Sequence, residues 1–247
     1  MPQSKAEQIS ETYDHIELTE AEIAEGLHQA RIEKHYRLKR EAYNERIRKE
    51  NQPLKLTWDE LFIRFQNTFD VDVENRHIVE NLCHYFADDY KFEGDPNKGL
   101  LLVGGVGIGK TTLMQFFKRN QKASYRVMSC REIESDFSSE GEKSVQYCSY
   151  NVPIAVNSNP FGHQEIGFCF DDLGTEANAK HFGKEKNVMA EIILNRYDNQ
   201  IAFPCTHITT NLNAEQIKAQ YGSRVTDRMR EMFNIITFDK NAKSRRK

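Results

Sequence analysis

The stretch that decides the fold runs from Leu100 to Thr112 and reads LLLVGGVGIGKTT. Its aliphatic start predicts a buried strand, and the glycine-rich part from Gly104 to Thr111 satisfies G-x-x-x-x-G-K-[ST] at every position. Residues 112–117 continue with the pattern of a helix. Backbone N–H groups can approach an anion closely where no Cβ intervenes, and a helix N-terminus adds partial positive charge. The stretch therefore predicts a loop that binds nucleotide phosphates, the alternative being a glycine-rich turn without a ligand.

The chemistry of such a loop assigns a role to each polar side chain. Lys110 is expected to reach the β- and γ-phosphates as a point charge, and the Thr111 hydroxyl is expected to ligate Mg²⁺. The nine residues expected to hold the nucleotide are Gly104, Gly105, Val106, Gly107, Ile108, Gly109, Lys110, Thr111 and Thr112.

A second apolar run, at residues 166–170, ends in two carboxylates, Asp171 and Asp172. A strand that ends beside the phosphate loop is where such a protein holds Mg²⁺, so Asp171 is expected to bind the metal through its water shell. Asp172 is then the candidate base that polarises an attacking water. A plain strand-end turn is the alternative explanation of the pair.

Four segments in a fixed order resemble the DnaC/IstB-like group of AAA+ ATPases. They are DDLGTE at 171–176, EIILNRYDNQ at 191–200, HITTNL at 207–212 and YGSRVTDRM at 221–229. The resemblance covers roughly residues 75–240. It implies a P-loop NTPase fold, a site for ATP and Mg²⁺, and ATP hydrolysis.

The resemblance also implies roles for three residues outside the phosphate loop. Asn211 follows the third segment's strand and would hold the attacking water or the γ-phosphate, although a lone Asn after a strand is usually a turn residue. Arg224 would act in trans on the nucleotide of a neighbouring subunit. Arg228, four residues later on the same helix face, either supports Arg224 or forms an ion pair with Asp227 or Glu231.

The chain departs from the family pattern at the second carboxylate, where AAA+ proteins usually carry Glu. The shorter arm of Asp172 leaves the base farther from the water and predicts slow hydrolysis stimulated by DNA or by oligomerisation. Glu176 is a nearby alternative base.

The sequence as a whole predicts an α/β domain with a five-stranded, mainly parallel sheet. The five strand candidates alternate with helical stretches and lie at 100–103, 125–129, 167–170, 207–210 and 235–238. Helices are expected near 57–65 and 74–90. Only nineteen residues, 229–247, remain from Met229 onward, so we expect no separate C-terminal lid.

An N-terminal helical segment is expected ahead of this domain. Thr19 and Glu22 form a potential capping box, and residues 20–50 contain one glycine and no proline. Acidic residues predominate before Arg31 and basic residues after it, which fits either a solvated helix face or a docking arm for a partner. We therefore divide the chain into a partner-binding segment (1–55), an AAA+ ATPase domain (56–240) and a basic tail (241–247) that we expect to be disordered.

Single-stranded DNA is the favoured nucleic-acid partner. Residues 131–165 form a long insertion in which 144–150 is expected to hold an extra helix. Lys143, Tyr147 and Tyr150 would then either stack with DNA bases or simply pack, and packing is the slightly favoured alternative. The four bases of the tail, together with Lys240 just before it, are available for phosphate contacts.

Composition narrows the classes of protein further. The formal net charge is -3, the five cysteines contain no C-x-x-C pair, and no apolar run is long enough to span a membrane. These features favour a cytoplasmic protein without a zinc site, a disulfide framework or a membrane partner.

The sequence favours a replicative-helicase loader that self-associates through a shared ATP site. The alternative within the group is a transposition helper that delivers target DNA to a transposase. A small-molecule kinase with a P-loop, and a switch that binds ATP but barely hydrolyses it, are the rivals from other classes.

Overall fold

The computed structural model describes residues 16–50, 53–155, 158–176, 179–181, 184–239 and 244–245. The chain divides into two units, Met1–Gln52 and Pro53–Lys247. No helix in the described ranges is both long and apolar enough to cross a membrane.

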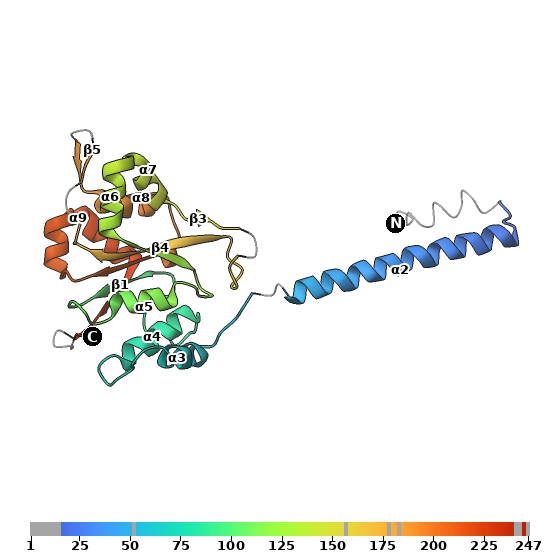
Figure 1. Cartoon of the computed structure of the whole chain (residues 1–247), viewed down its shortest axis with the longest axis horizontal. Helices are drawn as coiled ribbons and strands as arrows, with labels where there is room; N and C mark the ends of the chain where they lie inside the picture. Colours follow the sequence, from blue (N-terminus) through green and yellow to red (C-terminus); the bar gives the residue numbers. More distant parts are fainter. Residues whose placement is uncertain are drawn as a thin grey trace, which may run out of the picture. The chain divides into compact units, whose positions relative to one another are not determined.

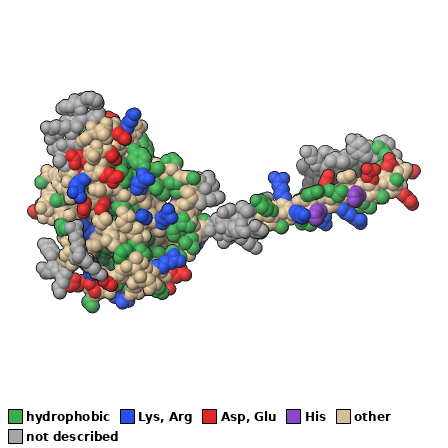
Figure 2. Space-filling view, viewed as in Figure 1, with side chains coloured by type: hydrophobic (Ala, Val, Ile, Leu, Met, Phe, Trp, Pro, Cys, Tyr) green, Lys and Arg blue, Asp and Glu red, His purple; other side chains and the backbone are tan. Residues whose placement is uncertain are grey.

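The described residues of the first unit form helix α2 (Glu20–Glu50), with the expected bounds. The predicted capping box is present: the Thr19 N–H and hydroxyl donate to the Glu22 carboxylate at 2.8 and 2.7 Å. All described side chains of α2 are exposed. Figure 2 shows its acidic side chains toward one end and Lys and Arg side chains farther along.

The second unit is a three-layer α/β/α domain (Figure 1). Its helices are α3 (Trp58–Gln66), α4 (Arg76–Phe86), α5 (Lys110–Phe117), α6 (Cys130–Glu140), α7 (Glu142–Ser149), α8 (Val188–Asp198), the short η1 (Phe203–Cys205) and α9 (Ala214–Met232). Its strands are β1 (Gly99–Val103), β2 (Tyr125–Ser129), β3 (Val152–Pro153), β4 (Glu165–Leu173), β5 (Ala179–His181), β6 (Lys184–Lys186), β7 (Thr206–Thr210) and β8 (Phe233–Thr237).

The central sheet has the order β2-β4-β7-β1-β8, and every neighbouring pair in it is parallel. The five strands predicted from the sequence are therefore confirmed as one parallel sheet. A sixth, very short strand, β3, adds antiparallel to β4, and β5 pairs with β6 in a separate hairpin. Strand β7 lies between β1 and β4.

The two faces of the sheet bury separate apolar clusters because successive strand residues point to opposite sides. Leu100 and Leu102 of β1 pack with residues of α3, α4 and α5, whereas Leu101 packs with Phe168, Phe170 and residues of α6 to α9. The inner strands β1, β4 and β7 are covered on both faces, which explains the continuous apolar runs in β1 and β4.

Several boundaries differ from the sequence-based expectations. Strand β4 extends from Glu165 to Leu173, beyond the expected 167–170, because the ladder with β2 continues to Asp171. The last strand begins at Phe233 and ends at Thr237. Helix α4 ends at Phe86, and Asp88 just beyond it has a left-handed backbone (φ 54°). The insertion holds two helices, α6 and α7, where one was expected.

The fully buried Arg196 gives the segment 191–200 a structural role. Its guanidinium donates to the Thr206 hydroxyl at 2.8 Å and to the carbonyl oxygens of Cys205, Cys148 and Tyr150 at 2.9, 3.1 and 3.1 Å. Burial lowers its pKa to about 10. The arginine therefore joins α8 to the start of β7 and to the end of α7.

The buried His207 makes the stability of the domain depend on pH. Its Nδ1 accepts the Leu100 N–H at 3.1 Å, and burial lowers its pKa to about 3. The unfolded chain binds the proton more readily, so stability falls as pH drops below about 6.5. We expect the free energy of unfolding, measured with urea, to lose roughly 2 kcal/mol from this residue between pH 8 and pH 5.

His207→Asn keeps an acceptor for Leu100 and removes the titrating group. Its loss of stability between the two pH values should be smaller than that of the unchanged chain. His77→Asn, on the exposed face of α4, is the matched control. An equal pH dependence for His207→Asn and the unchanged protein would contradict this account.

Candidate nucleotide-binding site

The phosphate loop joins β1 to α5 and depends on glycine for two different reasons. A Cβ on Gly104 would lie 2.5 Å from Cδ1 of Ile108 and 2.9 Å from Cβ of Phe238, so no side chain fits there. Gly109 precedes the first turn of α5 with φ 98°, a left-handed backbone that other residues adopt at a cost. The loop thus brings the N-terminus of α5 to the carboxyl end of β1.

Lys110 lies buried beneath the loop and crosses to the next strand. Its ammonium donates to the carbonyl oxygens of Gly104 and Gly105 at 2.8 Å each. It also donates to Oδ1 of Asn211 at 2.7 Å. The structure therefore brings together two of the predicted site residues, Lys110 and Asn211, from segments 101 residues apart.

Thr111 and Asp171 form a second contact across the site. The Thr111 hydroxyl lies 2.9 and 3.0 Å from the two carboxylate oxygens of Asp171. The Thr209 hydroxyl donates to the same carboxylate at 2.7 Å. Burial raises the pKa of Asp171, while these hydroxyl contacts act in the opposite direction.

Asp171 and Asp172 line the same cavity although consecutive strand residues normally face opposite sides. Two features account for this. The pairing of β4 with β7 shifts register between Phe170 and Leu173, and Asp172 has a left-handed backbone with φ 56°. The Asp172 N–H donates to the Thr209 hydroxyl at 2.9 Å, which stabilises this turn of the chain.

The phosphate cavity has a volume of about 400 Å³. It is lined by Val106, Gly107, Gly109, Lys110, Thr111, Thr112, Asp171, Asp172, Asn211 and Arg245. It combines the Lys110 ammonium, the start of a helix and a carboxylate pair. Polyphosphate with a bound divalent cation matches this combination of charges.

The oxygen ligands available here suit Mg²⁺, which prefers carboxylate and hydroxyl oxygens and retains several waters. Thr111 and Asp171 are the protein groups that would hold it. Within the described ranges, no group of three or more His, Cys, Asp or Glu side chains is arranged so that it could hold a metal ion.

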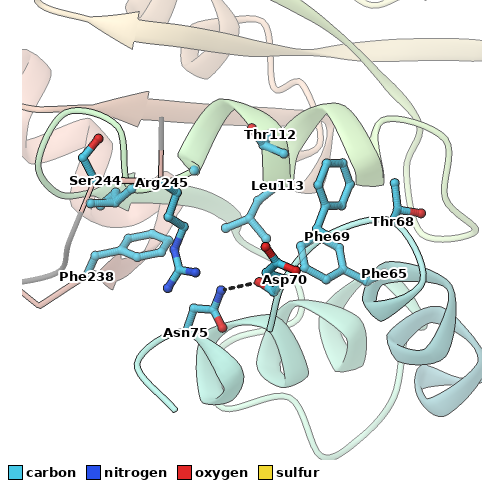
Figure 3. Close-up of a pocket in the computed structure, with 12 residues that line it drawn as sticks. Phe65, Thr68, Phe69, Asp70, Asn75, Thr112, Leu113, Phe238, Ser244 and Arg245 are labelled. Carbon is cyan, nitrogen blue, oxygen red and sulfur yellow. Dashed lines mark hydrogen bonds between the residues drawn. The ribbon is translucent and has the colours of Figure 1, made fainter. Parts of the chain in front are cut away.

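A second, more apolar cavity of about 630 Å³ adjoins the first and shares Gly109, Thr112 and Arg245 with it. Figure 3 shows Phe65 and Phe69 on one side, with Phe238 on the other. Asn75 is held at its rim, where its amide donates to the Asp70 carbonyl oxygen at 3.2 Å. Aromatic walls with a few polar groups suit a planar base next to a phosphate site.

Sequence reasoning missed several residues of this site. It assigned a role to Asn211 but none to Thr209 or Thr210; the Thr210 hydroxyl donates to the Leu173 carbonyl oxygen at 2.7 Å and accepts the Leu212 N–H at 3.0 Å. The paired threonines before Asn211 were the available signal. Of the predicted basic tail, the structure describes only residues 244–245, and there the Arg245 N–H donates to the Gly107 carbonyl oxygen at 2.8 Å. The prediction that the rest of the tail is disordered lies outside the described residues.

The alternative base Glu176 is occupied by structural contacts. It is buried, accepts the Gly174 N–H at 2.8 Å and bonds with the Tyr221 hydroxyl. It does not line the phosphate cavity. Asp172 is therefore the better placed of the two candidate bases.

Arg224 and Arg228 lie on α9 after a break at Gly222, outside both cavities. The exposed Arg224 is 3.8 Å from the Asp198 carboxylate. Arg228 pairs with Asp227 and Glu231 at 3.5 and 3.6 Å, and its guanidinium lies over the Tyr197 ring, 4.4 Å from the centroid. Arg228 thus forms the ion pairs with Asp227 and Glu231 that the structural interpretation predicted.

The ionised Asp171 should lower the stability of the domain in the absence of ligand. Because burial raises its pKa, its ionised form is less favourable in the folded than in the unfolded chain. We expect Asp171→Asn to raise the Tm measured without Mg²⁺ and nucleotide, and to reduce ATP hydrolysis by about 100-fold or more. Asp70→Asn, in the adjoining cavity, is the control; a lowered Tm for Asp171→Asn would contradict the expectation.

Comparison with known proteins gives a likeness of fold. No family model and no curated protein matches the chain. The crystal structure of the DnaC helicase loader matches over 71% of this chain and 96% of that chain, with 18% identity and a TM-score of 0.43. The structure of DnaI matches over 71% and 88%, with 18% identity and a TM-score of 0.46. AMPPCP-bound DnaA from Aquifex aeolicus matches over 70% and 49%, with 14% identity and a TM-score of 0.45. The parallel sheet and the glycine loop between β1 and α5 give this chain a P-loop type of α/β fold.

Proposed function

We propose that this chain is an AAA+ ATPase that binds ATP with Mg²⁺, acts on DNA as a helicase loader and completes its ATP site by self-association. One observation carries the ATPase part of the proposal. The ends of β1, β4 and β7 bring Lys110, Asp171 and Asn211 to a single cavity. This group supplies a cation for phosphate, a carboxylate for Mg²⁺ and an amide that can both donate and accept a hydrogen bond.

Each of these side chains has a definable part in hydrolysis. Lys110 would exchange its contacts with the loop carbonyl oxygens for the terminal phosphates. Asn211 is positioned by its bond with Lys110 and can orient a water, and Asp172 can accept a proton from that water. When bound, Mg²⁺ would supply neutralising charge at the phosphate oxygens.

The phosphate-loop assignment makes a direct prediction. We expect Lys110→Ala to weaken ATP binding by about 100-fold, since a buried charge-assisted contact to phosphate is lost. Equilibrium titration with a fluorescent ATP analogue measures the change. Lys118→Ala, just after the same helix and exposed, is the matched control. Equal affinity for Lys110→Ala and the control would remove the basis of the assignment.

The position of Arg224 supports a shared site. It lies outside the phosphate cavity of its own chain and lines a separate cleft on α9 with Lys218 and Arg230. Its ion pair with Asp198 is long, at 3.8 Å, and exposed, so the guanidinium can move to another anion. The ATP site of a neighbouring subunit would offer such an anion.

Mixing two inactive variants tests this shared site. Arg224→Ala retains its own cavity, and Asp172→Asn retains its arginine. In a head-to-tail assembly formed from equal amounts, about one interface in four joins an intact cavity to an intact arginine, so about a quarter of the original turnover should return. Arg228→Ala mixed with Asp172→Asn reports whether Arg228 shares the role. No recovery in an assembled Arg224→Ala mixture would rule out the trans arrangement.

A cleft beside α7 supports single-stranded DNA as a ligand. Lys143, Tyr147 and Tyr150 line this cleft, and the two tyrosines are 41% and 48% exposed. Tyr147 is also partly packed: its hydroxyl accepts from Arg126 at 2.7 Å and its ring lies edge-on to Phe168. Exposed aromatic rings beside cationic side chains suit stacking with bases and contact with phosphates.

The partner of α2 decides between helicase loader and transposition helper. The helix exposes Ile23, Leu27, Ile32, Tyr36 and Leu38, which suits docking to another protein. Co-purification of the full chain with a hexameric replicative helicase in ATP supports the loader, and loss of that complex in Ile23→Ser/Leu27→Ser places the contact on α2. Capture of a transposase instead supports the helper.

A further inference from the structure

We propose that Arg245 is an autoinhibitory strap that lies across the nucleotide site and must move when ATP enters. The inference rests on the proposed ATP site and names a means of regulating it. Arg245 lines both the apolar cavity and the phosphate cavity, at the place where they meet. A ligand with a base in one cavity and phosphates in the other would have to pass through this junction.

The strap has one contact on each side of the junction. On the phosphate side, the Arg245 N–H donates to the Gly107 carbonyl oxygen at 2.8 Å, and its Cδ would lie 3.8 Å from a Cβ on Gly109. On the other side, its guanidinium lies 2.9 and 2.8 Å from the two oxygens of the Asp72 carboxylate. Figure 3 shows the side chain extending away from the phosphate loop toward Asn75.

The carboxylate that receives the guanidinium is itself held in place. Oδ1 of Asp72 accepts the N–H groups of Glu74 and Asn75 at 3.0 and 3.1 Å, in the turn that leads into α4. The Asn75 amide oxygen accepts the Asp72 N–H at 2.9 Å. Asp72 is therefore a fixed anchor, whereas Arg245 is the part that can leave.

The strength of these contacts suits a strap that ATP can displace. The ion pair is partly exposed, with side-chain exposures of 26% for Arg245 and 50% for Asp72, so water screens it. One backbone hydrogen bond adds a modest amount. Removing the strap should therefore change nucleotide affinity by about 3- to 10-fold.

Two substitutions release the strap from opposite ends. Arg245→Ala removes the guanidinium, and Asp72→Asn removes the anchoring charge while keeping an acceptor for Glu74 and Asn75. Each should bind the fluorescent ATP analogue about 3- to 10-fold more tightly than the unchanged chain, mainly through faster association. Arg76→Ala, which breaks an exposed ion pair with Glu80 on α4, is the matched control and should bind as the unchanged chain does.

The affinities of the two variants also show whether Arg245 blocks the nucleotide or contacts it. Weaker binding by Arg245→Ala would mean that the guanidinium contacts the nucleotide, and it would overturn the proposal. Unchanged binding by both variants would overturn it as well.

Hydrogen exchange of the full chain distinguishes failure of the strap from failure of the ATP site. With ATP, the amides of residues 105–112 should exchange more slowly and the Arg245 amide more quickly. Slower exchange in the loop without faster exchange at Arg245 would overturn the strap alone. If ATP changes the exchange rate neither in the loop nor at Arg245, the proposed ATP site is wrong. The strap is then tested without nucleotide: Asp72→Asn should make the Arg245 amide exchange faster, and an unchanged rate would overturn the strap as well.

Discussion

The parallel pairing of β7 between β1 and β4 is the constraint on which the site depends. It places the carboxyl ends of three strands side by side, and each strand contributes one part of the phosphate cavity. The Thr209 hydroxyl links two of these parts, since it donates to the Asp171 carboxylate and accepts the Asp172 N–H. A shift of β7 by one residue would turn Thr209 to the other face of the sheet and separate the carboxylate pair from the loop.

The apolar layers on both faces of the sheet hold these polar groups in place. Lys110 and Asp171 are almost fully buried, and burial of charge is costly unless partners compensate it. In this chain the compensation comes from loop carbonyl oxygens, an amide and two hydroxyl groups. In the proposed ATP site, a nucleotide and a cation would replace some of these contacts.

Two residues that belong to none of the sequence motifs lie near the junction of the two cavities. Asp72, in the turn before α4, and Arg245, near the end of the chain, meet across the junction of the two cavities. Arg224 faces outward on α9, away from its own cavity. In the proposed mechanism, Arg245 covers the site of its own chain and Arg224 serves the site of a neighbouring subunit.

The sequence alone determined the class of fold, because strands covered on both faces must be apolar throughout and a phosphate loop needs glycine at fixed positions. It also predicted Lys110 from the phosphate-loop pattern and Asp171 from the end of a strand, whereas the role of Asn211 was implied by the resemblance of residues 207–212 to a known family. It did not determine the role of Thr209, the shared face of Asp171 and Asp172, or the position of Arg245. Those depend on a register shift in β4, a left-handed Asp172 and a contact between residues 173 positions apart. Only the tertiary structure decides such features, because local patterns carry no information about which distant segments meet.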